Sequence, residues 1–242
     1  MDAYKPSRSL WLNPDIQYLF NSEIIEYDIQ DAGFSLVRQY RLLPQQEIVR
    51  LSQCQKGLER HIAIGKLQKG NKQFATRLSE KFTEIRALFI GYNKLTDDRI
   101  ISVKKDAIYT IGKCEKINFG EIHFLEKNHY TSYVRFPHLS NLELYYDSVT
   151  NNIDVKGMSD VSVNRHRLYM LDFLRTVINA CETKDMSVKR FVSDFIMKYK
   201  TLALDERYYL EFNNMSNTQN VAFNYQNIIV PMVQILLREV VL

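Results

Sequence analysis

The sequence SEIIEYDIQDAGFSLV, residues 22–37, holds a short apolar run that ends at an acidic residue, after which the chain turns. Residues 22–29 are apolar and partly β-branched, which predicts a short β-strand. Residues 31–40 follow as a turn into a helix. Asp28, at the end of the strand, therefore projects a carboxylate from a rigid support into the space above a sheet edge.

A second acidic residue lies in a similar setting further along the chain. Residues 99–112, RIISVKKDAIYTIG, predict a strand, a tight charged turn that contains Asp106, and a second strand. If this hairpin neighbours the first strand, the two carboxylates converge, which suits Mg²⁺ because it takes oxygen ligands and usually only one or two carboxylates. The alternative is that Asp28 caps a helix and Asp106 is an ordinary turn residue.

The rest of the chain alternates between helical and strand patterns. Residues 45–92 are helical and basic, with one apolar face at three- and four-residue steps: Phe74, Leu78, Phe82, Ile85 and Phe89. Strands are predicted at 117–125 and 129–136, with a hairpin of 142–148 and 152–157. Helices are predicted at 169–181, 186–199 and 227–240. This order predicts an α+β fold with an antiparallel sheet and a C-terminal helical part.

The composition excludes several classes of protein. Three cysteines, far apart and odd in number among 242 residues, fit neither zinc-ligand spacing nor a disulfide framework, so a reducing compartment is expected. The first residues lack the apolar run of a signal peptide, and no stretch reaches the length of a membrane span. We therefore expect a cytoplasmic protein without a membrane partner. The net charge of +4 allows a polyanionic partner and equally fits an ordinary surface.

Several motifs resemble those of template-dependent polymerases. Residues 27–37, YDIQDAGFSLV, resemble motif A of reverse transcriptases and family B DNA polymerases. Residues 100–110, IISVKKDAIYT, resemble motif C of family B polymerases. The segments 127–136 and 153–160, KNHYTSYVRF and IDVKGMSD, resemble the segment after motif C in those enzymes. The resemblance covers roughly residues 22–165 and is typical of small bacteriophage-encoded proteins.

The resemblance implies a polymerase-like palm with a short helical fingers insertion and a helical thumb-like part. The implied segments are a palm strand with motif A, a fingers-like segment, a palm hairpin with motif C and further strands, and a thumb-like segment: 1–44, 45–95, 96–164 and 165–242. The implied partners are a nucleic-acid primer–template and nucleoside triphosphates.

The same resemblance implies roles for individual residues. Asp28 and Asp106 would be catalytic and, with the backbone of Ile29, would bind Mg²⁺ (or Mn²⁺). The implied nucleotide-binding residues are Gly33, Phe34, Lys72, Arg77 and Lys81. The implied nucleic-acid-binding residues are Lys104, Lys105, Lys127, Tyr130 and Lys156. The alternatives are a solvated helix face for the basic residues of 72–81 and a sheet with one wet face for the strand residues.

Two departures from the family pattern keep other functions open. Polymerase motif C commonly has two acidic residues, whereas Lys104 and Lys105 precede Asp106 here, and the motif B pattern of family B enzymes is absent. The chain is thus a minimal template-dependent nucleotidyltransferase, an inactive polymerase-derived nucleic-acid-binding or regulatory protein, or one subunit of a split polymerase that needs a partner chain. Gly33 stands near a position where the resembling families use a bulky residue to exclude the sugar 2′-hydroxyl. It predicts that ribonucleotides are accepted, unless the glycine only serves the turn.

Overall fold

The computed structural model describes residues 3–54, 57–136, 142–157, 172–204 and 234 of the chain. The chain divides into two compact units. The first comprises Met1–Asp15 and Glu23–His129, and the second comprises Ile16–Ser22 and Tyr130–Leu242. The expected boundaries at 44, 95 and 164 concern functional segments, and they stay predictions.

The first unit is built on a six-stranded sheet with the order β1-β4-β5-β3-β7-β6. Its strands are β1 (Leu10–Leu12), β3 (Ile24–Ile29), β4 (Ile100–Lys104), β5 (Ala107–Ile111), β6 (Asn118–Phe119) and β7 (Ile122–Tyr130). β4 pairs antiparallel with β1 and β5, β3 pairs antiparallel with β5, and β6 pairs antiparallel with β7. The predicted strand at 22–29 and the hairpin at 99–112 are confirmed.

One predicted strand of this unit is wrong in its extent. The sequence predicted a single strand at 117–125, whereas the chain turns between β6 and β7, where Gly120 has a φ of 66°. β7 then continues to Tyr130, past the expected end. The apolar pattern of this stretch does not show the turn, because only the glycine marks the left-handed backbone.

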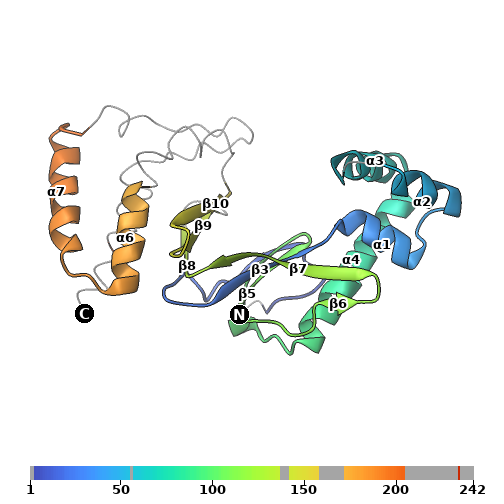
Figure 1. The fold of residues 1–242 in the computed structure, drawn as a ribbon, viewed down its shortest axis with the longest axis horizontal. Helices are drawn as coiled ribbons and strands as arrows, with labels where there is room; N and C mark the ends of the chain where they lie inside the picture. Colours follow the sequence, from blue (N-terminus) through green and yellow to red (C-terminus); the bar gives the residue numbers. More distant parts are fainter. Residues whose placement is uncertain (1–2, 55–56, 137–141, 158–171, 205–233, 235–242) are drawn as a thin grey trace. The chain divides into compact units, whose positions relative to one another are not determined.

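The helices of the first unit are α1 (Ala32–Tyr40), α2 (Gln45–Ser52), α3 (Gly57–Gly70), α4 (Lys72–Tyr92) and the short 3₁₀ helix η1 (Asp97–Arg99). The long helix α4 packs on one face of the first sheet, whereas α2 and α3 lie beyond the end of the sheet with α1 (Figure 1). The ring of Phe89 on α4 lies 5.3 Å from that of Tyr27 on β3 and 4.3 Å from that of Phe124 on β7, centroid to centroid. Because side chains alternate along a strand, burial of Tyr27 on this face turns Glu26 and Asp28 to the opposite face.

The second unit has a four-stranded antiparallel sheet with the order β10-β9-β8-β2. Its elements are β2 (Tyr18–Leu19), β8 (Ser132–Phe136), β9 (Leu142–Asp147), β10 (Asn152–Lys156), α6 (Asp172–Thr183) and α7 (Val188–Lys200). The apolar face of the sheet packs with α6 and α7. The predicted hairpin and two predicted helices are confirmed. The helix expected at 227–240 falls almost entirely outside the described residues.

Both units combine helices with antiparallel strands, so the predicted α+β class is confirmed. Among the residues that the structure describes, no helix has the length and apolar character needed to cross a bilayer.

Candidate functional site

The register of β3 and β5 brings the two predicted carboxylates to the same end of neighbouring strands. Asp28 pairs with Ala107, the residue that directly follows Asp106 in the β4–β5 turn. The alternative in which Asp28 caps the helix is wrong, because the N-cap of α1 is Asp31 and Asp28 lies within β3. The carboxylate of Asp28 is therefore not engaged in capping α1.

The two carboxylates repel each other. Burial, followed by the charge of Asp28, raises the pKa of Asp106 above its ordinary value. A bound cation would relieve this repulsion, so the two carboxylates fit a metal ion. Within the described part of the chain, no group of three or more His, Cys, Asp or Glu side chains is arranged to hold one. A cation here would thus rely on two carboxylates with backbone, water or substrate oxygens, as Mg²⁺ commonly does.

Lys127 on β7 reaches this pair from the neighbouring strand. Its Nζ lies 2.6 Å from Oδ2 of Asp28 and 3.9 Å from Oε1 of Glu26. Glu26 is only 2% exposed, and Nδ2 of Asn128 donates to its Oε2 at 2.6 Å. The sequence interpretation missed Glu26, although its place two residues before Asp28 puts it on the same face of β3.

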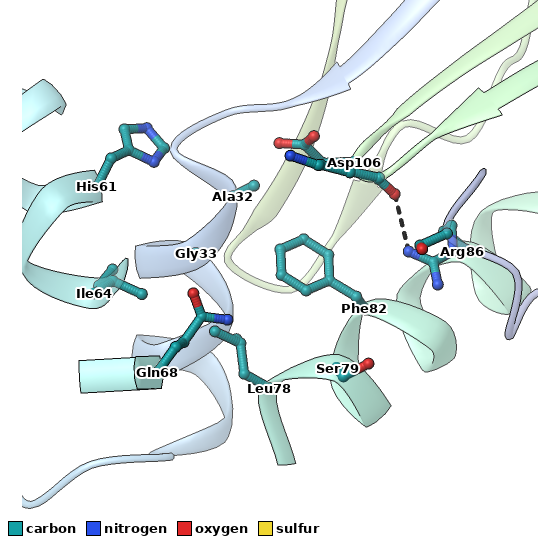
Figure 2. Close-up of a pocket in the computed structure, with 12 residues that line it drawn as sticks. Ala32, Gly33, His61, Ile64, Gln68, Leu78, Ser79, Phe82, Arg86 and Asp106 are labelled. Carbon is teal, nitrogen blue, oxygen red and sulfur yellow. Dashed lines mark hydrogen bonds between the residues drawn. The ribbon is translucent and has the colours of Figure 1, made fainter. Parts of the chain in front are cut away.

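A pocket of about 410 Å³ opens beside Asp106. It is lined by residues of the N-terminal segment, α1, α3, α4 and the β4–β5 turn: Ser9, Ala32, Gly33, His61, Ile64, Gln68, Leu78, Ser79, Phe82, Arg86, Lys105 and Asp106. Figure 2 shows His61 and Asp106 on opposite sides of the first turn of α1, with the ring of Phe82 below Asp106. The lining thus combines apolar side chains, such as Ile64, Leu78 and Phe82, with charged and polar ones.

The N-terminus of α1 forms one wall of this pocket. Its N-cap, Asp31, has left-handed backbone (φ 48°, ψ 48°) and makes no capping hydrogen bond with its side chain. The carboxylate of Asp31 pairs with Arg60 on α3 instead. The carbonyl of Asp31 accepts from the N–H groups of Phe34 and Ser35 at 3.0 and 2.9 Å. The N–H groups of Ala32 and Gly33 remain as first-turn donors, which find no acceptor within an α-helix and favour an anion.

Gly33 contributes space to the pocket. It lies inside α1, and it is not among the residues with positive φ, so the conformation of the turn does not require glycine there. A Cβ at this position would lie 3.4 Å from Cδ1 of Ile64, an ordinary van der Waals contact. The backbone of the turn therefore does not require glycine at this position, and the role of Gly33 in sugar selection stays a prediction.

Arg86 fixes the turn that carries Asp106. Arg86 is 2% exposed; its Nη1 donates to the carbonyl of Lys105 and its Nε to the carbonyl of Pro6, each at 2.9 Å. Lys105 itself has a φ of 56°, and its N–H donates to the carbonyl of Ser9 at 2.6 Å. The sequence interpretation missed Arg86. The available signal was its position between Phe82 and Phe89 at helical spacing, on the buried face of α4.

Four of the predicted nucleotide-binding residues do not line the pocket. Lys72 and Arg77 are exposed on α4. Lys81 pairs with Glu84 at 2.5 Å and lies over the ring of Tyr40. The Phe34 ring is buried, with the guanidinium of Arg60 4.5 Å from its centroid. None of these side chains lines the cavity.

The predicted lysines of the strands divide between two settings. Lys105 lines the pocket, whereas Lys104 lies over the ring of Tyr109, with its Nζ 5.4 Å from the centroid.

Tyr130 is only 5% exposed, and its hydroxyl donates to Oδ2 of Asp154 at 2.9 Å. Asp154 also pairs with Lys156 at 2.7 Å. Tyr130 and Lys156 belong to the second unit, and the buried ring of Tyr130 offers no free face to a nucleic-acid base.

Comparison with known proteins relates nearly the whole chain to one family. A search of curated proteins finds no match. The model of a family described as bacteriophage PBS1 gene 130 protein matches residues 4–240. The match confirms the expectation of a bacteriophage protein, and its description names no activity. The chain belongs to the bacteriophage PBS1 gene 130 protein family.

Proposed function

We propose that the first unit is a polymerase-like palm that joins nucleotides to a nucleic-acid strand by metal-assisted phosphoryl transfer. One observation carries this proposal: the β3–β5 register brings Asp28 beside Asp106, and Asp106 lines a pocket that also includes the first residues of α1, whose N-cap makes no side-chain capping bond. This chemistry requires carboxylates that bind divalent cations and, beside them, hydrogen-bond donors that bind phosphate. The helices α2, α3 and α4 would then act as fingers.

The carboxylates of Asp28 and Asp106, with the backbone carbonyl of Ile29, would hold Mg²⁺ or Mn²⁺. When bound, such an ion makes the attacking hydroxyl more acidic and stabilises the charge on the leaving pyrophosphate. Arg86 keeps Asp106 in place through the carbonyl of Lys105. Because this positioning is present before substrate binds, it does not have to be organised during the reaction.

The triphosphate contacts would come from α1 and the β4–β5 turn. The N–H groups of Ala32 and Gly33 carry the partial positive charge of the helix N-terminus, and Lys105 adds a full charge to the lining. We therefore assign the phosphates to these groups in preference to Lys72, Arg77 and Lys81. The apolar side chains of Ile64, Leu78 and Phe82 would take the apolar part of the nucleoside.

A second candidate function is a nucleic-acid-binding protein that has kept the palm without catalysis. The ion pair between Lys127 and Asp28 favours it, because an ammonium group already neutralises one of the two carboxylates. Lys104 and Lys105 beside Asp106 favour it as well. The two candidates differ in turnover, so they are separated by an assay of strand extension alongside one of binding.

The test is extension of labelled primers on DNA and RNA templates with Mg²⁺ or Mn²⁺ and either set of nucleotides. We expect extension by the wild type and at least a roughly 1000-fold loss in Asp28→Asn, because a metal-binding carboxylate is removed. Asp98→Asn is the matched control, since Asp98 is an exposed carboxylate on η1. Tight primer–template binding without extension by the wild type supports the binding protein instead.

Gly33 gives a prediction about the sugar. The wild type is expected to use ribonucleotides and deoxyribonucleotides with efficiencies within about tenfold of each other, because no side chain at Gly33 blocks a 2′-hydroxyl. Gly33→Phe should lower ribonucleotide use at least roughly tenfold more than deoxyribonucleotide use. Gly33→Ala, whose methyl group fits beside Ile64, is the control and should preserve the preference. Strict deoxyribonucleotide selection by the wild type contradicts the prediction.

A further inference from the structure

Lys127 occupies the place where the proposed function requires a cation. Its ammonium group lies 2.6 Å from Asp28 and 3.9 Å from Glu26, and Asp106 adds to the negative field around it. We propose that Lys127 is a tethered counter-ion that a divalent cation must displace from Asp28, and that Glu26 is the positioning residue that receives the displaced ammonium. This inference rests on the proposed function only in taking the site to bind a divalent cation.

The geometry allows such an exchange with a small movement. The side chain of Lys127 is 54% exposed and has a long flexible stem, so its head group is free to swing. A shift of about 1 Å toward Glu26 would shorten this ion pair to hydrogen-bonding distance. Glu26 is well placed to receive it, because its carboxylate is buried and the amide of Asn128 holds it.

The charges explain why the ammonium group is needed in the absence of a cation. Asp28 and Asp106 repel each other, and Glu26 is a further carboxylate with almost no access to water. A buried carboxylate is strongly unfavourable unless it is paired or hydrogen-bonded. Lys127 supplies one positive charge to this group and thereby competes with any other cation. The free energy of its pair with Asp28 is subtracted from the binding free energy of the metal ion.

Binding of Mn²⁺, followed by the electron paramagnetic resonance signal of the free ion, tests the competition directly. We expect Lys127→Met to bind Mn²⁺ roughly fivefold more tightly than the wild type at low salt, as an exposed ion pair of modest strength predicts. Lys113→Met is the matched control. It removes the same charge from the same unit, but Nζ of Lys113 pairs with Glu126, at 3.1 Å, and its Mn²⁺ affinity should change less than about twofold. Unchanged or weaker Mn²⁺ binding in Lys127→Met overturns the inference.

A double-mutant cycle tests the role of Glu26. Glu26→Gln keeps a hydrogen-bonding group beside Asn128 but removes the charge that receives Lys127. We expect it to weaken Mn²⁺ binding in the wild type roughly threefold more than in the Lys127→Met background. Equal weakening in both backgrounds shows that Glu26 acts on the cation without Lys127 and rejects its assigned role. Circular dichroism of each variant verifies that it is folded.

Failure of this inference is distinguishable from failure of the proposed function, because binding and extension are measured separately. Primer extension by the wild type together with unchanged Mn²⁺ affinity in Lys127→Met keeps the polymerase and rejects the tethered counter-ion. Tighter Mn²⁺ binding in Lys127→Met without extension by any variant keeps the counter-ion and rejects the polymerase.

Discussion

Asp106→Asn is expected to abolish strand extension while raising the melting temperature of the protein. The loss of activity, roughly 1000-fold or more, follows from removing one of two carboxylates that would hold the metal ion. The gain in stability follows from removing a charge that the fold disfavours. Burial and the neighbouring Asp28 raise the pKa of Asp106, so the folded protein binds this proton more tightly than the unfolded chain does.

The sign of the pH dependence is fixed by that difference. The stability contributed by protonated Asp106 is fully present below its ordinary pKa and is lost as the pH rises through the raised folded value. At neutral pH the ionised carboxylate therefore destabilises the fold, whereas asparagine has no charge to bury. We expect a rise in melting temperature of about 2 °C at pH 7.5 without divalent cations, from a gain below 1 kcal/mol.

Thermal unfolding monitored by fluorescence at pH 7.5 and at pH 4, in a chelator, checks the prediction. The difference between Asp106→Asn and the wild type should shrink at the lower pH, and Asp98→Asn should show neither the gain nor the loss of activity. A lower melting temperature for Asp106→Asn at neutral pH contradicts the electrostatic account. Extension at the wild-type rate contradicts the catalytic one.

The sequence was sufficient to predict the strands that carry Asp28 and Asp106. Apolar runs that end in a charged residue or a tight turn depend on local chain properties, and β3 and the β4–β5 hairpin form where those patterns lie. The contact between Asp28 and Lys127 was harder to predict, because it joins residues 99 positions apart. It depends on β3 and β7 being neighbours in the sheet order, which no local pattern gives.

The basic residues of α4 show a second limit of sequence patterns. Helical periodicity separated the apolar face of α4 from the polar one, yet it did not say which polar residues face the pocket. Ser79 and Phe82 line the cavity, whereas Arg77 and Lys81 do not. That choice depends on how α4 is rotated against α1 and α3, which is decided by packing.

The tyrosines of the second unit show the same limit in a sheet. Tyr130 was predicted to bind nucleic acid, but it is buried, as are Tyr133 and Tyr145, whose hydroxyls both donate to Glu143, at 3.1 and 2.8 Å. Alternation along a strand says which residues share a face. It does not say whether that face is covered.

Arg86→Met is expected to be the most destabilising single change at the site. It removes a buried guanidinium that donates to the carbonyls of Pro6 and Lys105, and both acceptors would lose a charged donor. We expect a loss of about 3 kcal/mol in unfolding free energy. This corresponds to a melting temperature lower by roughly 9 °C for a chain of this size. The unfolding free energy of Arg86→Lys should lie between those of the wild type and Arg86→Met. The lysine keeps a charged donor, but its ammonium group cannot reproduce the planar fork of donors of a guanidinium.

The loss of stability in Arg86→Met should be greatest in the β4–β5 turn. This would show that Arg86 positions Asp106 and does not only support α4. Hydrogen exchange of the β4–β5 hairpin amides should accelerate in Arg86→Met more than exchange in the rest of the sheet, because the guanidinium holds the carbonyl next to Asp106.

Arg77→Met is the matched control, since Arg77 is exposed on the same helix, and its stability should stay within about 0.5 kcal/mol of the wild type. Equal urea unfolding of the two variants would show that the bonds of Arg86 contribute little. Faster exchange in the hairpin with undiminished extension in Arg86→Lys would show that the reaction tolerates movement of Asp106, and the preorganised carboxylate pair would then have to be abandoned as the basis of the mechanism.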